Sequence, residues 1–313
     1  MKLENKSILI TGGTGFLGSE IYKQFQKKGY ENVSIIGSEC DLRNKAITIG
    51  AIYPFDIVIH CAANCGGIGY NRKFPGTLFY ENMLMGMNVL EACRLNHHLK
   101  KLILIGTVCA YPKFTDVPFL EDDLWNGYPE ETNAPYGLAK RELLTMAQAY
   151  KKEYGMNIIY LIPVNMYGEN DRGFFNEERS HVIPAMIKKI IDAKISNSKE
   201  VRLWGSGEVS REFLYVSDCA RAIYLATEYY DKINPVNIGT GEEIKIRNLA
   251  KLIAYIVGYD GEIIWDVSKP DGQPRRCLNV ERAEDGFGFK AEISLEEGLK
   301  KTIDWYKNER KKK

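Results

Sequence analysis

The first 165 residues alternate between short apolar runs and amphipathic segments, and this alternation constrains the fold more than any other feature of the chain. The apolar runs span residues 7–10, 33–36, 57–59, 102–105 and 158–162. The main amphipathic segments span residues 18–28, 80–95 and 136–154. Apolar strands that are separated by helices form a parallel sheet with helices covering both faces. The sequence therefore predicts an α/β fold built on a doubly wound parallel sheet.

A glycine-rich loop, ITGGTGFLG at residues 10–18, joins the first apolar run to the first helical segment. Glycines at such a turn let the backbone approach a pyrophosphate, whose charge then lies at the N-terminus of the following helix. Because the loop opens the series of strands and helices, it predicts a Rossmann domain that binds a dinucleotide. The residues expected to line the cofactor here are Gly12, Thr14, Gly15, Phe16, Leu17, Ser38, Asp41, Leu42, Ala62 and Ala63.

The end of the second apolar run bears on the type of dinucleotide. It reads Ile36-Gly37-Ser38 and contains no acid, and Glu39 is the nearest one. Domains selective for NAD often carry Asp or Glu at this strand end, where it binds the ribose hydroxyls. The absence favours NADP(H), and Arg43 is a candidate partner for the additional phosphate.

The alternation weakens after residue 163. We expect helices at residues 182–191, 246–257 and 294–306, strands at 200–204 and 262–265, and strands at 211–218 and 235–241 that rejoin the main sheet. This pattern predicts two lobes. Residues 1–164 and 213–241 would form the dinucleotide-binding domain, and residues 165–212 and 242–313 a smaller α/β substrate-binding lobe.

Tyr136 and Lys140 are four residues apart in a helical segment, so both lie on one face of the helix. A phenol has a pKa of about 10, which is too high for ready proton exchange at neutral pH. A nearby ammonium group stabilises the phenolate and lowers this pKa toward the working range. Thr107 follows the apolar run 102–105 and can donate a hydrogen bond to the same substrate oxygen. These three residues predict a proton-donating group for the reduction of a carbonyl.

Composition excludes several other classes. A formal net charge of +1 gives no basic field for nucleic acid. No segment approaches the about 20 apolar residues of a membrane helix, and the N-terminus lacks the apolar region of a signal peptide, so we expect a cytoplasmic protein that does not bind membranes. The seven cysteines include no CxxC pair, which argues against disulfides and against a bound metal such as zinc.

Longer segments carry a family resemblance that runs nearly end to end. They are AANCGGI (62–68), CAYPK (109–113), NAPYGLAK (133–140), PVNMYG (163–168), SHVIPAMIKK (180–189), WGSGEVSREFLYVSD (204–218), VNIGTG (236–241) and SKPDGQPRR (268–276). With the glycine-rich loop, these segments resemble the extended short-chain dehydrogenase/reductase family. Within it, they resemble the enzymes that epimerise and reduce GDP-4-keto-6-deoxy sugars with NADP(H).

The resemblance implies a role for each matching residue. Thr107, Tyr136 and Lys140 would act in reduction, and Cys109 and His181 in epimerisation at C3 and C5. The residues that would contact the cofactor further include Tyr136, Lys140, Pro163 and Asn165. The residues that would line the GDP-sugar site are Asn165, Val182, Lys189, Trp204, Arg211 and Lys269. The family also implies a homodimer, for which the helices at 80–95 and 136–154 are candidate faces.

The chain departs from the family pattern at three places. Thr107 stands where relatives commonly have Ser, which keeps the hydroxyl. Lys189 stands where relatives often have Arg, which keeps the charge but loses the bidentate fork. The second strand ends in Gly37-Ser38, where relatives can carry Arg for the phosphate of NADP.

The chemistry supports this interpretation independently of the family. The C–H bonds at C3 and C5 of a 4-keto sugar are acidified by the carbonyl, and inverting either carbon needs a base on one ring face and an acid on the other. A thiolate and an imidazole suit these roles, and Cys109 lies two residues from Thr107. His181 could instead be a polar residue that starts a helix.

The cationic residues that suit a nucleotide diphosphate are Lys188, Lys189, Arg211, Lys269, Arg275 and Arg276, and Trp204 could pack against the base.

Other functions remain open at this point. One alternative is a reductase without epimerisation that acts on a related GDP-4-keto sugar, such as a GDP-6-deoxy-4-keto-heptose in surface polysaccharide synthesis. A second is a non-catalytic dinucleotide-binding sensor, which the presence of both Tyr136 and Lys140 disfavours. A 4,6-dehydratase is disfavoured because such relatives carry Asp-Glu after the threonine, where this chain has Val108-Cys109.

Overall fold

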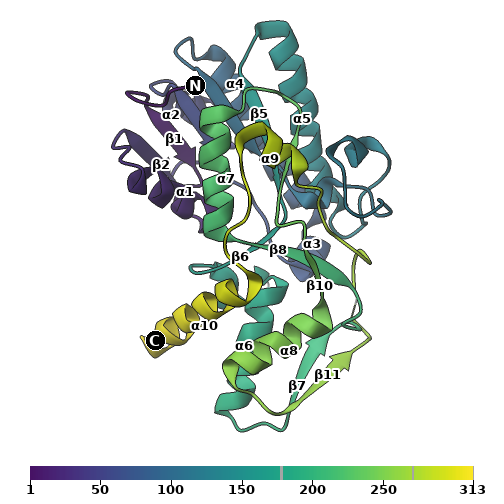
Figure 1. The fold of residues 1–313 in the computed structure, drawn as a ribbon. Helices are drawn as coiled ribbons and strands as arrows, with labels where there is room; N and C mark the ends of the chain where they lie inside the picture. The colour runs from purple at the N-terminus through teal and green to yellow at the C-terminus, as the bar shows by residue number, and fades with distance from the viewer. Residues whose placement is uncertain (177–178, 270, 313) are drawn as a thin grey trace.

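The computed structural model describes residues 1–176, 179–269 and 271–312. A parallel sheet of six strands, in the order β2-β1-β3-β4-β5-β9, forms its centre. Its strands are β1 (Ile8–Thr11), β2 (Val33–Ile36), β3 (Ile57–His60), β4 (Lys101–Ile105), β5 (Ile158–Pro163) and β9 (Val236–Ile238). The helices around it are α1 (Phe16–Lys27), α2 (Lys45–Ile52), α3 (Ile68–Lys73), α4 (Pro75–Leu95), α5 (Ala134–Tyr154), α7 (Val216–Tyr229) and α9 (Glu281–Phe287). The predicted doubly wound α/β fold is confirmed (Figure 1).

The strand order explains why helices cover both faces of the sheet. The chain leaves β1 in one direction to reach β2 and then returns past β1 to β3. Because parallel crossovers are right-handed, this reversal places α1 on one face and α2 on the other. Helix α1 packs against α7, and α4 packs against α2 and α5. The five strands predicted in the first 165 residues match the observed ones to within about one residue. Four of them, β1, β3, β4 and β5, are buried along their whole length, whereas β2 at the sheet edge is partly exposed.

A smaller part of the chain forms two further sheets, in the orders β10-β8-β6 and β11-β7. The strands are β6 (Asn165–Tyr167), β7 (Glu200–Trp204), β8 (Ser210–Tyr215), β10 (Glu243–Lys245) and β11 (Glu262–Asp266). The helices are α6 (Val182–Ile195), α8 (Ile246–Val257) and α10 (Leu295–Lys311). Three short 3₁₀ segments complete the described elements: η1 (Val108–Ala110), η2 (Glu121–Trp125) and η3 (Arg172–Phe174).

One predicted strand is wrong in its placement. Residues 211–218 were expected to rejoin the main sheet, but β8 pairs with β6 and β10 in the three-stranded sheet. The chain then enters α7 at Val216, where Asp218 lies in the first turn, as the helix dipole favours. An apolar run does not distinguish a strand from the start of a buried helix, which is why the sequence missed this boundary. The segment 235–241 does rejoin the sheet, since β9 pairs with β5.

Two clusters of buried apolar side chains correspond to the two regions. The first surrounds the six-stranded sheet, and the second lies among α6, α8, α10 and the smaller sheets. Leu278, Phe287 and Phe289 pack in the first cluster, although they fall in the segment assigned from sequence to the smaller lobe. The division of the chain into two lobes remains a proposal. Among the described helices, none is both long enough and apolar enough to cross a membrane.

Candidate active site

A cleft of about 1370 Å³ lies beyond the carboxyl ends of the parallel strands, between them and helix α6. Cavities at this edge of an open α/β sheet are where such folds bind ligands. The cleft is lined by every residue that the sequence predicted to contact the cofactor: Gly12, Thr14, Gly15, Phe16, Leu17, Ser38, Asp41, Leu42, Ala62, Ala63, Tyr136, Lys140, Pro163 and Asn165. It is also lined by the other predicted reactive residues, Thr107, Cys109 and His181.

The glycine-rich loop brings two strand ends together at one end of the cleft. A Cβ at Gly12 would lie 2.7 Å from the backbone nitrogen of Ala62, and the positive φ of +67° also favours glycine there. Gly15 begins α1 without a side-chain cap, so the first N–H groups of this helix face outward from the loop. The uncapped start of α1 lies next to a loop whose backbone leaves no room for a side chain at Gly12. This arrangement suits the pyrophosphate of a dinucleotide.

An acidic residue, Glu39, lies three residues beyond the end of β2. The Glu39 carboxylate turns back and accepts a hydrogen bond from the Gly37 N–H, which lowers the pKa of Glu39 below its ordinary value. Arg43 lines the cleft beside it and pairs with Asp41 at 2.9 Å and with Glu81 at 2.6 Å. Arg43 therefore lines the cleft next to the strand end where the adenosine ribose of a dinucleotide would bind, and Glu39 lies close to that strand end without lining the cleft.

The Thr107–Tyr136–Lys140 group forms because α5 approaches η1 closely. A Cβ at Gly137 would lie 2.2 Å from the carbonyl oxygen of Cys109, so only glycine permits this packing. The Tyr136 hydroxyl forms a hydrogen bond with Thr107, and Lys140 is 3% exposed. Burial lowers the pKa of Lys140 to about 8. The structure thus brings together a phenol, a hydroxyl and a buried ammonium group in one wall of the cleft.

The expected lowering of the Tyr136 pKa is wrong for this structure. Burial of the phenol raises the pKa of Tyr136 well above 10, and the thiols of Cys65 and Cys109 add to the increase. Only the hydrogen bond with Thr107 is seen to act in the opposite direction. The cost of desolvating a phenolate is the largest effect, so Tyr136 is held protonated and can serve as a proton donor.

Cys109 and His181 reach the cleft from different elements. Cys109 lies in η1, and its backbone N–H donates to Thr107 Oγ1 at 3.2 Å. His181 is exposed at the start of α6, and no hydrogen bond from its side chain caps the helix. A Cβ at Gly67 would lie 2.1 Å from the carbonyl oxygen of Ser180, so this glycine lets the segment before α6 approach the sheet. The interpretation of His181 as a helix-starting residue is correct for its backbone, while its side chain faces the cleft.

The predicted substrate residues divide into two groups. Asn165, Val182, Lys189, Trp204 and Arg211 line the cleft. Lys269 does not line it. Lys269 follows β11 and, together with Trp204, lines a smaller hollow of about 380 Å³. The Nζ atoms of Lys189 and Lys269 each lie 5.5 Å from the centroid of the Trp204 ring, which is half exposed.

The sequence did not predict two features of the site. Buried Asp171 interacts electrostatically with His181, and burial raises the pKa of this carboxyl while His181 opposes the rise. No motif signalled it. Arg276 was predicted only as one of several cations for a diphosphate, yet its guanidinium reaches Cys109 and Asn165. Its neighbour Arg275 instead pairs with Glu243 and does not line the cleft, so its predicted role is wrong.

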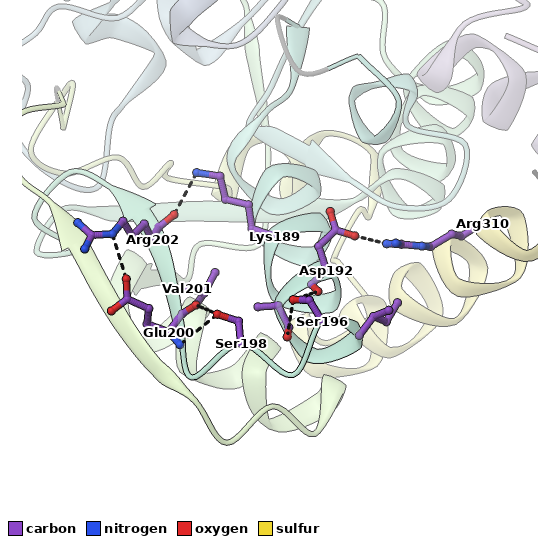
Figure 2. Close-up of a pocket in the computed structure, with 10 residues that line it drawn as sticks. Lys189, Asp192, Ser196, Ser198, Glu200, Val201, Arg202 and Arg310 are labelled. Atoms are coloured by element: carbon purple, nitrogen blue, oxygen red, sulfur yellow. Dashed lines mark hydrogen bonds and ion pairs between the residues drawn. The ribbon is translucent and has the colours of Figure 1, made fainter.

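A second, open hollow lies on the far side of Lys189 (Figure 2). Its charged groups pair with one another: Asp192 with Arg310, and Glu200 with Arg202 at 3.2 Å. Lys189 donates to the carbonyl oxygen of Arg202 at 3.1 Å. No thiol, imidazole or phenol is among the described residues that line this hollow, so it lacks the reactive groups found in the large cleft. Among the described residues, no group of three or more acidic, histidine or cysteine side chains could hold a metal ion.

A Rossmann sheet with a glycine-rich phosphate loop and a Thr-Tyr-Lys group at the same cleft defines an extended short-chain dehydrogenase/reductase. The family model described as "NAD dependent epimerase/dehydratase family" matches residues 8–239, and the chain belongs to this family. The chain is 36% identical to "Probable GDP-L-fucose synthase 1" of Oryza sativa subsp. japonica, over 96% of this chain and 91% of that protein.

Two solved structures resemble the whole chain. A "GDP-6-OMe-4-keto-L-xylo-heptose reductase" from C. jejuni is 28% identical with a TM-score of 0.88, and 99% of each chain is covered. A "gdp-l-fucose synthetase from Naegleria fowleri bound to NADP" is 26% identical with a TM-score of 0.87, covering 98% of this chain and 95% of that one.

Proposed function

We propose that this protein uses NADPH to reduce the C4 ketone of a GDP-4-keto-6-deoxy sugar, after epimerising the sugar at C3 and C5. One observation carries the proposal. The hydrogen-bonded pair Thr107–Tyr136 and the Cys109 thiol line one cleft together with His181, which starts α6. The names of the relatives support the substrate class, because they act on GDP-linked sugars. The NADP-bound relative and the open start of α1 support the cofactor.

NADPH supplies the reducing equivalent for C4. The phenol of Tyr136 donates a proton to the oxygen of the ketone as it becomes an alcohol, and Thr107 hydrogen-bonds the same oxygen. The buried ammonium of Lys140 stabilises the negative charge that remains on the phenol oxygen. The Gly12 loop and the start of α1 bind the pyrophosphate of the cofactor.

Epimerisation uses two groups on opposite faces of the sugar ring. The Cys109 thiolate removes a proton from C3 or C5, and the neighbouring carbonyl accepts the charge as an enolate. His181 then returns a proton from the other face, which inverts the carbon. Asp171 is buried in electrostatic contact with His181 at this position.

The nucleotide binds at the other end of the cleft. Arg211 and Lys189 suit the diphosphate, and the half-exposed ring of Trp204 suits the base. Lys269 would contact the same nucleotide from the far side of Trp204.

A reductase that does not epimerise is the second candidate function, and the heptose reductase among the similar structures favours it. The two functions differ in one measurement. The protein is incubated without NADPH in heavy water with GDP-4-keto-6-deoxymannose, and C3 and C5 are followed by NMR. Deuterium uptake that disappears in Cys109→Ser supports the epimerase/reductase. No uptake by a protein that still oxidises NADPH with a GDP-4-keto sugar supports the reductase alone.

We also propose that the protein is a cytoplasmic homodimer that assembles through α4 and α5. Three large apolar side chains of α4 are exposed, Phe79, Tyr80 and Met87. Such a patch on paired helices is typical of a protein–protein contact. Light scattering on the purified protein tests the dimer, and Tyr80→Glu should shift it toward monomer.

A further inference from the structure

Arg276 is a buried cation that lacks a carboxylate partner among the described residues. Arg276 is 6% exposed, and its guanidinium forms no ion pair in the part of the chain that the structure describes. It donates instead to Cys109 Sγ at 3.6 Å and to Asn165 Oδ1 at 3.4 Å. Burying a charge without an opposite charge costs free energy. The groups that the guanidinium contacts therefore indicate what its burial is used for.

The guanidinium is fixed relative to the thiol by a second residue. Arg276 Nε donates to Gln273 Oε1 at 3.2 Å, and Gln273 is 2% exposed. Gln273 Nε2 in turn donates to the carbonyl oxygens of Pro112 and Lys113, at 3.1 and 3.0 Å. These two residues lie three and four positions after Cys109 in the chain. The turn that carries Arg276 is therefore bonded to the loop that carries the thiol.

The backbone of Arg276 is anchored as well. Its carbonyl oxygen accepts a hydrogen bond from the N–H of Glu212 in β8 at 3.0 Å. The next carbonyl, that of Cys277, accepts from the N–H of Phe119 at 2.8 Å. With both its backbone and its side chain held, Arg276 has little freedom to leave the sulfur.

A second guanidinium makes the surroundings of the thiol more positive. Burial and the charge of Arg276 lower the pKa of Arg211 to about 9. Cys109 is among the groups that act to raise the pKa of Arg211, so Arg211 also interacts electrostatically with the sulfur. The carboxylates that act on Arg211 are Asp271 and Glu130, and neither forms an ion pair with it. Cationic groups around a thiol favour the thiolate, which is the form that removes protons.

We propose that Arg276 is a positioning residue for Cys109, and that its guanidinium holds the sulfur against the sugar ring for proton removal. The proposal rests on the proposed epimerisation. The role would affect only one of the two half-reactions, because the guanidinium hydrogen-bonds Cys109 and Asn165 and no hydrogen bond is found between it and Tyr136 or Thr107 among the described residues. Loss of Arg276 should therefore impair proton removal from C3 and C5 while Tyr136 and Thr107 keep their arrangement.

The neighbouring arginine provides a matched control. Arg275 is exposed, and it pairs with Glu243 away from the cleft. Arg275→Gln removes one positive charge from the same turn without altering the surroundings of the sulfur. Arg276→Gln removes the donor to the sulfur, and Arg276→Lys keeps the charge but loses the planar fork.

The first measurement is deuterium uptake at C3 and C5 of GDP-4-keto-6-deoxymannose, at saturating substrate and without NADPH. We expect the maximal rate to fall by about tenfold or more in Arg276→Gln, to recover in part in Arg276→Lys, and to stay unchanged in Arg275→Gln. The dissociation constants for GDP and NADPH and the thermal midpoint of each variant are measured alongside. Uptake at the wild-type rate in Arg276→Gln overturns the proposal. So does weaker GDP binding with an unchanged maximal rate, which would make Arg276 a substrate-binding residue only.

The second measurement does not depend on epimerisation. Iodoacetamide alkylates a thiolate by forming a carbon–sulfur bond and releasing iodide, and peptide mass spectrometry reports Cys109 separately from exposed Cys65. We expect Cys109 to be alkylated about fivefold more slowly in Arg276→Gln than in the wild type or Arg275→Gln. If the wild type shows no deuterium uptake, the proposed epimerisation fails, and the alkylation rates alone decide. Equal rates in all three proteins then overturn the role of Arg276.

Discussion

Gly137 lies against the backbone carbonyl of Cys109, so that a Cβ at position 137 would be 2.2 Å from that oxygen. This contact sets the distance between α5, which carries Tyr136 and Lys140, and η1, which carries Cys109. The two sets of proposed reactive groups therefore share one close approach between backbones, with no side chain between them.

Gly137→Ala should separate these elements. Because the clashing atoms belong to backbone, we expect a loss of about 1–3 kcal/mol in the free energy of unfolding, as for overpacked cores. Both NADPH oxidation and deuterium uptake should fall together. Urea unfolding and the two activity assays check this result. Gly50→Ala is a suitable control, because a Cβ there meets nothing within 4 Å, and wild-type behaviour of Gly137→Ala would contradict the role of the contact.

Tyr136→Phe should remove the proton donor for C4. The phenol is hydrogen-bonded to Thr107 and held protonated by burial, so its loss leaves the developing alkoxide without a proton source. We expect single-turnover NADPH oxidation to slow by about 10²–10⁴-fold, with NADPH affinity nearly unchanged. Deuterium uptake at C3 and C5 should persist, because it uses Cys109 and His181. An unchanged rate of oxidation would refute the assignment of the donor.

The main sheet could be predicted from sequence because most of its strands are apolar on both faces and recur between helices. The cleft residues could be predicted for a related reason, since the carboxyl ends of parallel strands meet at one edge. Thr107 and Ala62 follow two such strands, and both line the cleft. Helix α7 was missed because the apolar run of β8 continues into its first residue, Val216, without a turn.

The remaining parts of the site depend on contacts between distant segments. Arg276 and Cys109 are 167 residues apart, and no periodicity in the sequence relates them. Lys269 lies in a loop after β11, where no strand or helix pattern indicates which side of Trp204 it occupies. The pKa of Tyr136 also depends on tertiary burial, which the spacing between Tyr136 and Lys140 does not reveal.

Lys140 predicts the pH dependence of both activity and stability. Burial lowers its pKa from 10.5 to about 8, so the ammonium loses its proton as the pH rises through that value. Because the ammonium form is the active one, single-turnover reduction should decline above a pH of about 8. Between the folded and the unfolded pKa, the unfolded chain binds more protons than the folded chain. The contribution of this group to the free energy of unfolding should therefore increase with pH between about 8 and 10.5.

Lys140→Met separates these effects from the other titrating groups. The variant should reduce substrate slowly at every pH, and it should lose the increase in stability on the alkaline side that the wild type shows. Denaturant unfolding at several pH values checks the second point. A wild-type rate that stays constant to a pH of about 10 would contradict a lowered Lys140 pKa.

Glu39 and Arg43 predict how the protein selects its dinucleotide. The Glu39 carboxylate accepts a hydrogen bond from the Gly37 N–H just after β2. At this position the carboxylate would repel the additional phosphate of NADPH. Arg43 lies in the same part of the cleft, although Asp41 and Glu81 share its charge. Because these groups are exposed, each should change the affinity by no more than about fivefold. Glu39→Gln should therefore raise the ratio of NADPH to NADH affinity by up to about fivefold, and Arg43→Ala should lower it by a similar factor. Fluorescence titration with both cofactors measures the ratio. If neither substitution changes the ratio, the additional phosphate of NADPH binds away from β2. If the preference for NADPH is lost only in Arg43→Ala, the Arg43 guanidinium is the partner of that phosphate.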